Sequence, residues 1–293
     1  MAADRARDAG HSGAQGSLLS AEPRAAPDAD GDARRAPRGA RPRVEALVWR
    51  RTDFRESSRV VTLLTRDQGK VRAIAKGAHR PDSPLLGKVD YCNLLRVELW
   101  RRGTAMPLLA RAELLHEPRA LREPTRFLLA DHLVGLVDEA LPDGRADEAL
   151  FDLVHGGLRL FERCPAPALA AVLCGVEWRF LLALGMQPPL DACAETGAPL
   201  PARAPVALSP AARGFVPARA APRGALRASP ASRAVLRTLG ATKGSAWPGL
   251  ALPRAALADA LTLLGSMLMQ ALERPPRSRP AAVRAALRAC SAG

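Results

Sequence analysis

The sequence predicts an α+β protein in which a small closed β-barrel is followed by a helical domain. The barrel is predicted because five short runs in the N-terminal part alternate apolar and polar residues or are apolar throughout. The helical domain is predicted because apolar residues then recur every three or four positions. Closure is expected because it removes the exposed edges of a small sheet. The expected strands are 44–51, 60–65, 70–76, 93–100 and 106–114.

Short turns are expected between neighbouring strands. The run RDQG (66–69) ends in a glycine, which accepts a positive φ and therefore suits a hairpin turn. The run RRGT (101–104) has the same character between the last two expected strands. Together the two turns predict two hairpins within one small domain.

Helices are expected where the apolar spacing changes from two to about 3.6 residues. Prolines near the expected ends, such as Pro124 and Pro142, mark plausible boundaries. Four strong helices and one short one are expected, at 129–140, 150–161, 169–180, 232–239 and 257–272.

The domain organisation follows from these patterns and from composition. Residues 1–43 have almost no large apolar side chains, so we expect a disordered extension. The barrel is expected at 44–116 and the helical domain at 117–275. Within the latter, 186–250 is rich in Pro, Ala, Gly and Arg and is expected to be mostly loop. Residues 276–293 form a basic tail that we expect to be frayed.

The net charge of +14 is distributed unevenly along the chain. Residues 44–112 carry 14 basic and 7 acidic side chains, and 201–293 carry 14 and 2, whereas 113–200 carry 7 and 14. A uniform arginine bias would not produce an acidic segment between two basic ones. Such a field favours polyanions, most often nucleic acid.

Several classes of site and location are not supported. The five cysteines are scattered with no CxxC pair, which fits reduced thiols in the cytoplasm. No run approaches about 18 apolar residues, and the N-terminus has no apolar signal core, so neither a membrane span nor secretion is expected. There is no GxxxxGK[ST] motif and no histidine in a recognisable nucleophile motif, so no enzyme, catalytic residue or small-molecule substrate is expected.

An acidic cluster between 138 and 152 invites a metal-site interpretation. Its members lie at the end of one expected helix and the start of the next. Carboxylates at a helix N-terminus are stabilised by the helix dipole. We therefore expect solvated carboxylates that stabilise a helix start.

A basic strand face carries the most specific chemistry. Alternation places Val71, Ala73 and Ala75 on one face of the strand 70–76 and the charged residues with Ile74 on the other. Such a face resembles the groove by which small barrels follow a phosphate backbone, although a solvated outer face explains it equally well. The candidate DNA-binding residues are Arg55, Arg59, Lys70, Arg72, Lys76, Arg80, Arg101 and Arg102.

A family resemblance is carried by the stretch LVWRRTDFRESSRVVTLLTRDQGKVRAIAKGAHRP, together with LVDEALPDGRADEALFDLVHGGL and EWRFLLALGMQPPLDAC in that order. These residues resemble the RecO family of bacterial DNA repair and recombination mediators. The resemblance implies an OB-fold followed by a helical domain, in a protein of the cytoplasm and nucleoid. It implies binding of single- and double-stranded DNA, annealing of complementary strands and, with RecR, loading of RecA onto DNA coated by the single-strand-binding protein SSB.

One departure from the family concerns a zinc site that many members carry after RFLLALG. Here Cys193 remains, but Thr196 stands at the position of the second cysteine, and 214–220 contains no cysteine. One thiolate cannot hold a tetrahedral zinc ion. We therefore predict a zinc-free segment, no metal and no cofactor.

The resemblance also implies a site for the acidic, Phe-ending tail of SSB on the helical domain. Such a tail needs an apolar pocket beside a cation. Arg179, with Phe180 and Arg126 or Arg122, is the candidate, although an aromatic residue on a broad apolar helix is more often part of the core.

Two alternatives to the DNA mediator stay open at this point. The first is an adaptor whose basic charge binds an acidic protein partner. The second is an RNA-binding OB-fold protein, which would use the same barrel physics.

Overall fold

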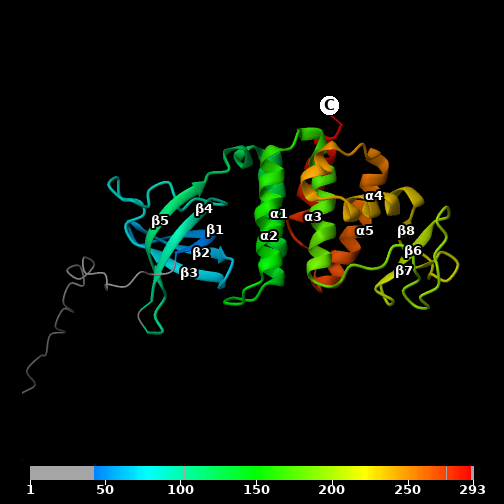
Figure 1. Ribbon diagram of the computed structural model, residues 1–293, viewed down its shortest axis with the longest axis horizontal. Coiled ribbons are helices and arrows are strands. Elements are labelled where there is room, and N and C mark those ends of the chain that lie inside the picture. The colour runs from blue at the N-terminus through cyan, green and yellow to red at the C-terminus, as the bar shows by residue number, and fades with distance from the viewer. Residues whose placement is uncertain (1–42, 102, 275, 292–293) are drawn as a thin grey trace, which may run out of the picture. The chain divides into compact units, whose positions relative to one another are not determined.

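The computed structural model describes residues 43–101, 103–274 and 276–291. The predicted extension 1–43 lies outside the described residues except for Arg43, which begins the first strand. The described chain contains a five-stranded barrel, then helices α1 to α3, a small sheet, and helices α4 to α6 (Figure 1). This arrangement confirms the predicted fold class.

The barrel closes in the order β1-β2-β3-β5-β4. Neighbouring strands are antiparallel, except that β3 meets β5 in parallel at Ile74 and Leu108. Pairing of Leu47 in β1 with Leu94 in β4 completes the circle, so the sheet has no long open edge. The strands are β1 (Arg43–Phe54), β2 (Ser58–Thr65), β3 (Gly69–Ala75), β4 (Leu94–Trp100) and β5 (Leu108–His116).

Strict alternation along β3 explains how the barrel fills its interior. Val71, Ala73 and Ala75 are buried, whereas Arg72 between them is exposed. The inward residues of the other strands join them in one apolar cluster with Val61, Leu63 and Leu95 among its members. The barrel therefore has its own core, and its outward positions are available to solvent or ligands.

The helices begin and end close to the predicted positions. Glu123 caps α1, its side chain accepting from the backbone N–H of Thr125 and Arg126, and Asp147 caps α2 through Leu150 N–H at 2.9 Å. The α-helices are α1 (Pro124–Ala140), α2 (Glu148–Arg163), α3 (Leu169–Ala183), α4 (Pro230–Ala241), α5 (Arg254–Ala271) and α6 (Arg279–Ala289). Short 3-10 turns lie at Arg119–Arg122, Ala166–Ala168 and Gly244–Gly249.

Helix α3 is the central element of the helical core. The stretch Ala166–Ala183 is long and apolar enough, by length and composition, to cross a membrane, with a mean hydropathy of 1.5. It passes this test although Glu177 and Arg179 interrupt its apolar run. In the fold, 67% of the stretch is buried, as in the core helix of a globular protein.

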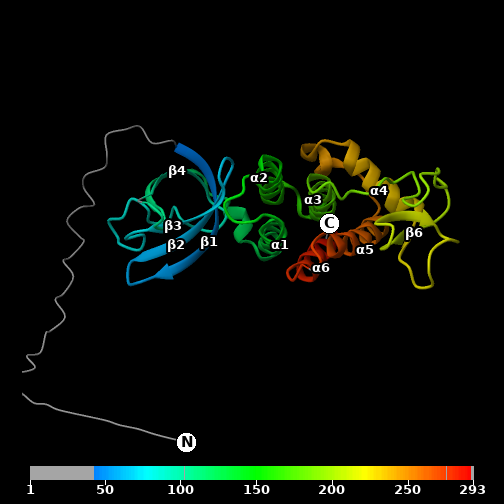
Figure 2. The same ribbon diagram turned by 90° about the horizontal axis from the view of Figure 1, so that it is seen from below.

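Two segments differ from the sequence expectation. The loop-rich region 186–250 contains a three-stranded sheet of order β7-β6-β8, which was missed because its strands are very short. They are β6 (Val206–Ser209), β7 (Gly214–Pro217) and β8 (Arg227–Ala228). The basic tail is not frayed over 279–289, since α6 packs against α1 and α3 (Figure 2). Its residues Ala282 and Ala286 are completely buried.

The barrel and the first helices share buried contacts. Leu47, Trp49 and Leu64 belong to the same apolar cluster as the residues of α1 and α2. The Trp49 indole N–H donates to Asp138 at the end of α1, at 3.1 Å. These contacts give the barrel a defined place against α1.

Candidate nucleic-acid interface

The outer face of β3 carries Arg72, Ile74 and, just beyond the strand, Lys76. Arg72 and Lys76 are exposed, and Ile74 is half-buried between them. Arg72 and Lys76 are four positions apart, and four residues of extended chain cover about 13 Å, so the two charges are well separated along the strand direction. A line of cations with an apolar residue between them suits a strand of nucleic acid better than a single small anion.

The predicted cations divide by whether they already have a partner. Five are exposed and form no ion pair with any described residue: Arg55, Arg72, Lys76, Arg80 and Arg101. We call these five the free barrel cations. The guanidinium of Arg55 lies 5.2 Å from the ring centroid of Phe54, an aromatic side chain that is itself exposed.

Lys70 is placed differently from the expectation. Its side chain is only 8% exposed, and its ammonium donates to Asp138 Oδ1 at 3.1 Å and lies 3.4 Å from Asp143. The reason is tertiary, because the backbone N–H of Gly144 donates to Lys70 O and holds the loop after α1 over this end of the strand. Lys70 therefore links the barrel to α1, and its charge is already neutralised.

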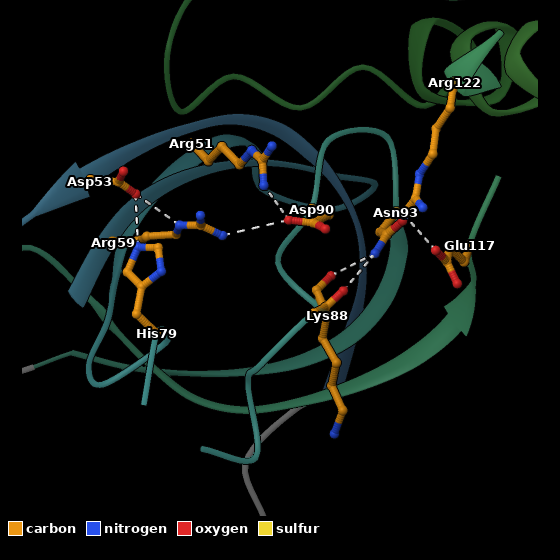
Figure 3. Close-up of polar contacts among 10 residues, drawn as sticks. Arg51, Asp53, Arg59, His79, Lys88, Asp90, Asn93, Glu117 and Arg122 are labelled. Atoms are coloured by element: carbon orange, nitrogen blue, oxygen red, sulfur yellow. Dashed lines mark hydrogen bonds and ion pairs between the residues drawn. The ribbon is translucent and has the colours of Figure 1, made fainter. Parts of the chain in front are cut away.

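Arg59 is also neutralised. Its side chain is 17% exposed and pairs with Asp53 at 2.9 Å and Asp90 at 3.5 Å (Figure 3). The pKa of Asp53 is lowered, first by its hydrogen bond with Arg59 and then by that with His79. Arg102, the last predicted member, lies outside the described residues.

The free barrel cations gather in two places. Arg72 and Arg101 line a hollow of about 810 Å³, with the exposed Met106 at its edge. Arg55 lies on the turn after β1, and Lys76 and Arg80 lie on the turn after β3. These two turns are joined because His79 N–H donates to Ser57 O at 3.0 Å.

A second basic surface lies on the small sheet β6–β8 and its loops. Residues 196–258 contain no Asp or Glu, so nothing within this stretch neutralises its arginines. Five of them are exposed and have no ion-pair partner among the described residues: Arg203, Arg213, Arg219, Arg223 and Arg227.

The segment that we expected to be zinc-free is organised by a buried arginine. Arg233 on α4 is 1% exposed, and its guanidinium donates to Leu190 O at 3.1 Å and Ala204 O at 3.3 Å, as well as to Pro201 O. Cys193 and Thr196 share a turn, and hydrogen bonds from Thr196 lower the pKa of that thiol. One cation on neighbouring carbonyls thus ties down the loop.

The three residues predicted for the SSB tail do not come together. Phe180 is fully buried in the core, and Arg126 donates to Cys164 O at 3.0 Å, where it caps the end of α2. Arg179 lies beside an apolar hollow of about 390 Å³, with its guanidinium 5.6 Å from the centroid of Trp247. Arg179 therefore borders this hollow without Phe180 or Arg126, and the alternative residue Arg122 lies at a different pocket, where it pairs with Glu117.

The acidic cluster does more than stabilise a helix start. Asp147 caps α2, as that expectation proposed. Asp138 instead receives Trp49, Arg50 and Lys70 from the barrel, and Asp152 pairs with Arg66 on the β2–β3 turn. Sequence reasoning missed this role because the partners lie more than 60 residues away in the chain.

Comparison with known proteins matches both halves of the chain to one family. Residues 41–118 match the model for the N-terminal part of recombination protein O, and residues 121–280 match the model for its C-terminal part.

Curated relatives carry the name DNA repair protein RecO. The protein of Symbiobacterium thermophilum is 33% identical over 53% of this chain and 61% of the relative. That of Geobacter metallireducens is 37% identical over 55% of this chain and 66% of the relative, and that of Bacillus pumilus is 32% identical over 52% and 59%. The chain thus spans less than two thirds of the length of the curated relatives it matches.

Proposed function

The chain belongs to the RecO family, and on that premise we propose that it is a non-enzymatic DNA-binding mediator of recombinational repair that anneals complementary single strands. The observation that supports this most directly is the set of free barrel cations, whose charge no described carboxylate neutralises. A cation already paired with a carboxylate gains little from a phosphate, whereas an unpaired one releases counterions from the DNA.

Annealing would follow from charge neutralisation on two surfaces. A single strand of DNA that lies along Arg72 and Lys76 has some of its phosphate charge neutralised, so it repels a second DNA strand less. The basic surface of β6–β8 supplies a second place for phosphates, so two strands can be held by one molecule. Between these surfaces, the acidic side chains of 138–152 are partly neutralised by the barrel, which reduces their repulsion of DNA.

Contacts with bases are expected to be few and indifferent to sequence. Ile74 is half-buried beside Arg72 and Lys76, Phe54 is exposed beside Arg55, and the exposed Met106 lines the hollow of Arg72 and Arg101. None of these three apolar side chains can read a base edge by hydrogen bonding. Affinity would therefore rest mainly on phosphates and fall steeply with salt.

The finer activities belong to the same proposal. We infer that the protein acts with RecR to help load RecA on SSB-coated DNA, in the cytoplasm and nucleoid, and that it needs no cofactor. The family membership and the two basic surfaces support this inference. The adaptor and RNA-binding alternatives share the charge but predict no acceleration of DNA pairing.

The hollow beside Arg179 is our proposed site for the SSB tail. Its lining of Leu153, Leu160 and Trp247 suits a terminal phenylalanine, and Arg179 supplies a cation for the terminal carboxylate. The Arg179 guanidinium keeps capacity for this role, because Nη2 donates to Thr242 O at 3.0 Å and no ion pair joins Arg179 to a described carboxylate. Its Nε is buried without a partner.

We expect Arg179→Ala to weaken binding of an acidic, Phe-ending SSB-tail peptide by about tenfold, since one charge-assisted contact is lost. Fluorescence anisotropy of the labelled peptide measures this change. Arg163→Ala is the matched control, because Arg163 is an exposed arginine on α2 outside the hollow. Unchanged affinity in Arg179→Ala would place the tail elsewhere.

The proposed function is tested by mixing complementary single strands with the full chain and following duplex formation. We expect annealing to be faster than the spontaneous rate and to slow as salt rises. Filter binding with DNA and RNA strands of the same sequence, over the same salt series, separates the three candidates. An adaptor binds neither strand, and an RNA-binding protein prefers RNA.

A further inference from the structure

A pocket of about 400 Å³ lies where the barrel meets the first helices. It is bordered by the loop before β4, the Arg119–Arg122 turn and the first turns of α1. Figure 3 shows its polar side chains Arg51, Asp90, Asn93, Glu117 and Arg122. A volume of this size is typical of small-molecule sites. Of the described residues predicted to bind DNA or the SSB tail, only Arg122 lines this pocket.

The floor of the pocket is aromatic and uncharged. Tyr91 and Phe127 lie with ring centroids 5.9 Å apart and tilted by 54°, and Phe127 is 45% exposed although it is a large apolar side chain. Burial raises the pKa of Tyr91 well above its usual value, and it raises the pKa of Cys92 to about 12. Both groups therefore stay neutral, and the exposed face of Phe127 is free to stack on a flat ring.

The rim alternates donors and acceptors. Arg122 donates to Glu117 at 2.6 Å, and Arg51 pairs with Asp90 on the barrel side. Both arginines are substantially exposed at the pocket mouth, so each pair can also offer N–H groups and a carboxylate oxygen to a ligand. A phosphate is a poor match for such a rim, because the two carboxylates repel it. A flat ring with both donors and acceptors on its edge is a good match.

A series of polar contacts leads from this pocket to the turn that carries Lys76 and Arg80. Asp90 also lies 3.5 Å from Arg59, and Arg59 and His79 both bind Asp53 (Figure 3). His79 is held on the turn that carries Lys76 and Arg80. A strand whose phosphates contact that turn therefore has a polar surface to follow toward the pocket.

We propose that this pocket receives one unpaired nucleobase of the bound single strand, with Phe127 stacked on its face and the two arginine–carboxylate pairs at its edge. The inference rests on the proposed function, since it adds a base contact to a backbone-binding surface. A nucleobase fits better than an aromatic side chain of a partner protein, because a phenyl ring would leave the polar rim unmatched. The pocket would thereby hold one base apart from the pairing strand and fix the register of the DNA.

The test compares a thymidine oligonucleotide with an abasic oligonucleotide of the same length. Wild-type protein should prefer the oligonucleotide that carries bases. Phe127→Ala should reduce that preference by about tenfold, since stacking on an aromatic side chain is lost. The salt dependence of binding should not change, because no phosphate contact is removed.

Two further variants and a cross-link make the result specific. Phe127→Leu keeps an apolar side chain at the same place and should lose the preference as well, whereas Leu86→Ala, an exposed apolar residue of a barrel loop outside the pocket, should keep it. An oligonucleotide containing 5-iododeoxyuridine should cross-link to Tyr91 or Phe127 on irradiation.

Full base preference in Phe127→Ala, or a cross-link that maps elsewhere, would overturn the pocket assignment. Failure of the wild-type protein to bind the thymidine oligonucleotide would instead overturn the proposed function. Salt-dependent binding by wild type with no effect of Phe127→Ala would leave the proposed function standing and reject the pocket alone.

Discussion

Ionic partners decide which barrel residues can reach a phosphate. Lys70 and Arg72 lie two positions apart on the same face of β3, so the strand pattern treats them alike. Lys70 is covered by Asp138 and Asp143, whereas Arg72 meets no described carboxylate. Changing Lys70 would therefore disturb the contact between the barrel and α1, and it is not a clean test of DNA binding.

Gly69 shows why the turn sequence RDQG needs its glycine. Its φ is +65°, and a Cβ at this position would lie 1.9 Å from the carbonyl oxygen of Arg145. Position 69 therefore requires a left-handed backbone, and it also requires a residue without a Cβ because the loop after α1 packs directly against it. The sequence indicated the first requirement, but the second depends on a residue far along the chain.

We predict that Gly69→Ala lowers the free energy of unfolding by at least about 2 kcal/mol, from backbone strain together with overpacking. Gly87→Ala is the control, because Gly87 also has a positive φ of +71° but no atom lies near its Cβ position. It should lose only the strain contribution, about 1 kcal/mol. Urea unfolding of both variants measures the difference, and equal losses would contradict the close-approach argument.

At the scale of elements, α6 is held by a buried ion network. Glu177 on α3 is fully buried and accepts from Arg279 on α6 at 2.8 Å, with His132 on α1 at 2.8 Å on the same carboxylate. Burial alone would raise the pKa of Glu177, but Arg279 and then His132 outweigh it, so the pKa is lowered. Three helices therefore depend on one ionised carboxylate.

This network predicts a loss of stability in acid. Because the pKa of Glu177 in the folded state is below its ordinary value of 4.5, its contribution is fully present above that value. The contribution is lost as the pH falls through the folded pKa. Glu177→Gln should lower the free energy of unfolding by about 3–5 kcal/mol at neutral pH, since Arg279 and His132 lose their partner.

The pH dependence itself separates this network from simple packing. Urea unfolding is measured at neutral pH and at about pH 4. The free energy of unfolding should fall less between these two pH values in Glu177→Gln than in wild type. Asp191→Asn is the control, because Asp191 forms an exposed pair with Arg237 that contributes little to stability. Parallel declines in wild type and Glu177→Gln would contradict the assignment.

The sequence was most informative where an element repeats a simple period. The alternation of β3 and the apolar spacing of α1, α2, α3 and α5 led to strands and helices close to the observed ones. It was least informative for β6–β8, whose strands have four residues or fewer, and for α6, whose buried face consists of alanines. Neither the short strands nor the small side chains produce a strong apolar signal.

In the molecule as a whole, some charges of the basic and acidic segments neutralise one another through contacts within the fold. The acidic residues Asp138, Asp143 and Asp152 face barrel cations rather than solvent alone. What remains unpaired is a barrel set and a set on the β6–β8 sheet. Net charge by segment predicted two basic regions, but only tertiary contacts reveal which arginines remain available.

The candidate site was predictable in kind but not in detail. Of the eight predicted barrel residues, five are free, two are neutralised and one is outside the described residues. The pocket at Phe127 was not predicted. The sequence did contain a signal for it, since Phe127 is an aromatic residue that lies off the apolar stripe of α1, which begins at Leu129. The pocket also depends on Tyr91 and Glu117, which only the fold brings near it.

The most direct test of the account is complementary-strand annealing by a variant that removes free charges only. We compare Arg72→Gln/Lys76→Gln/Arg101→Gln with Arg43→Gln/Arg96→Gln/Arg274→Gln, which lowers the net charge equally but changes arginines already paired with Glu98, Glu113 and Glu139.

We predict that the free-charge variant folds normally and anneals slowly. Its binding to a single strand should show a slope of log affinity against log salt that is shallower by about 2, at about 0.7 for each lost phosphate contact. The paired-charge variant should stay close to wild type in both measurements. Normal annealing by the free-charge variant, or an equal loss in both, would contradict the claim that the free barrel cations hold the DNA.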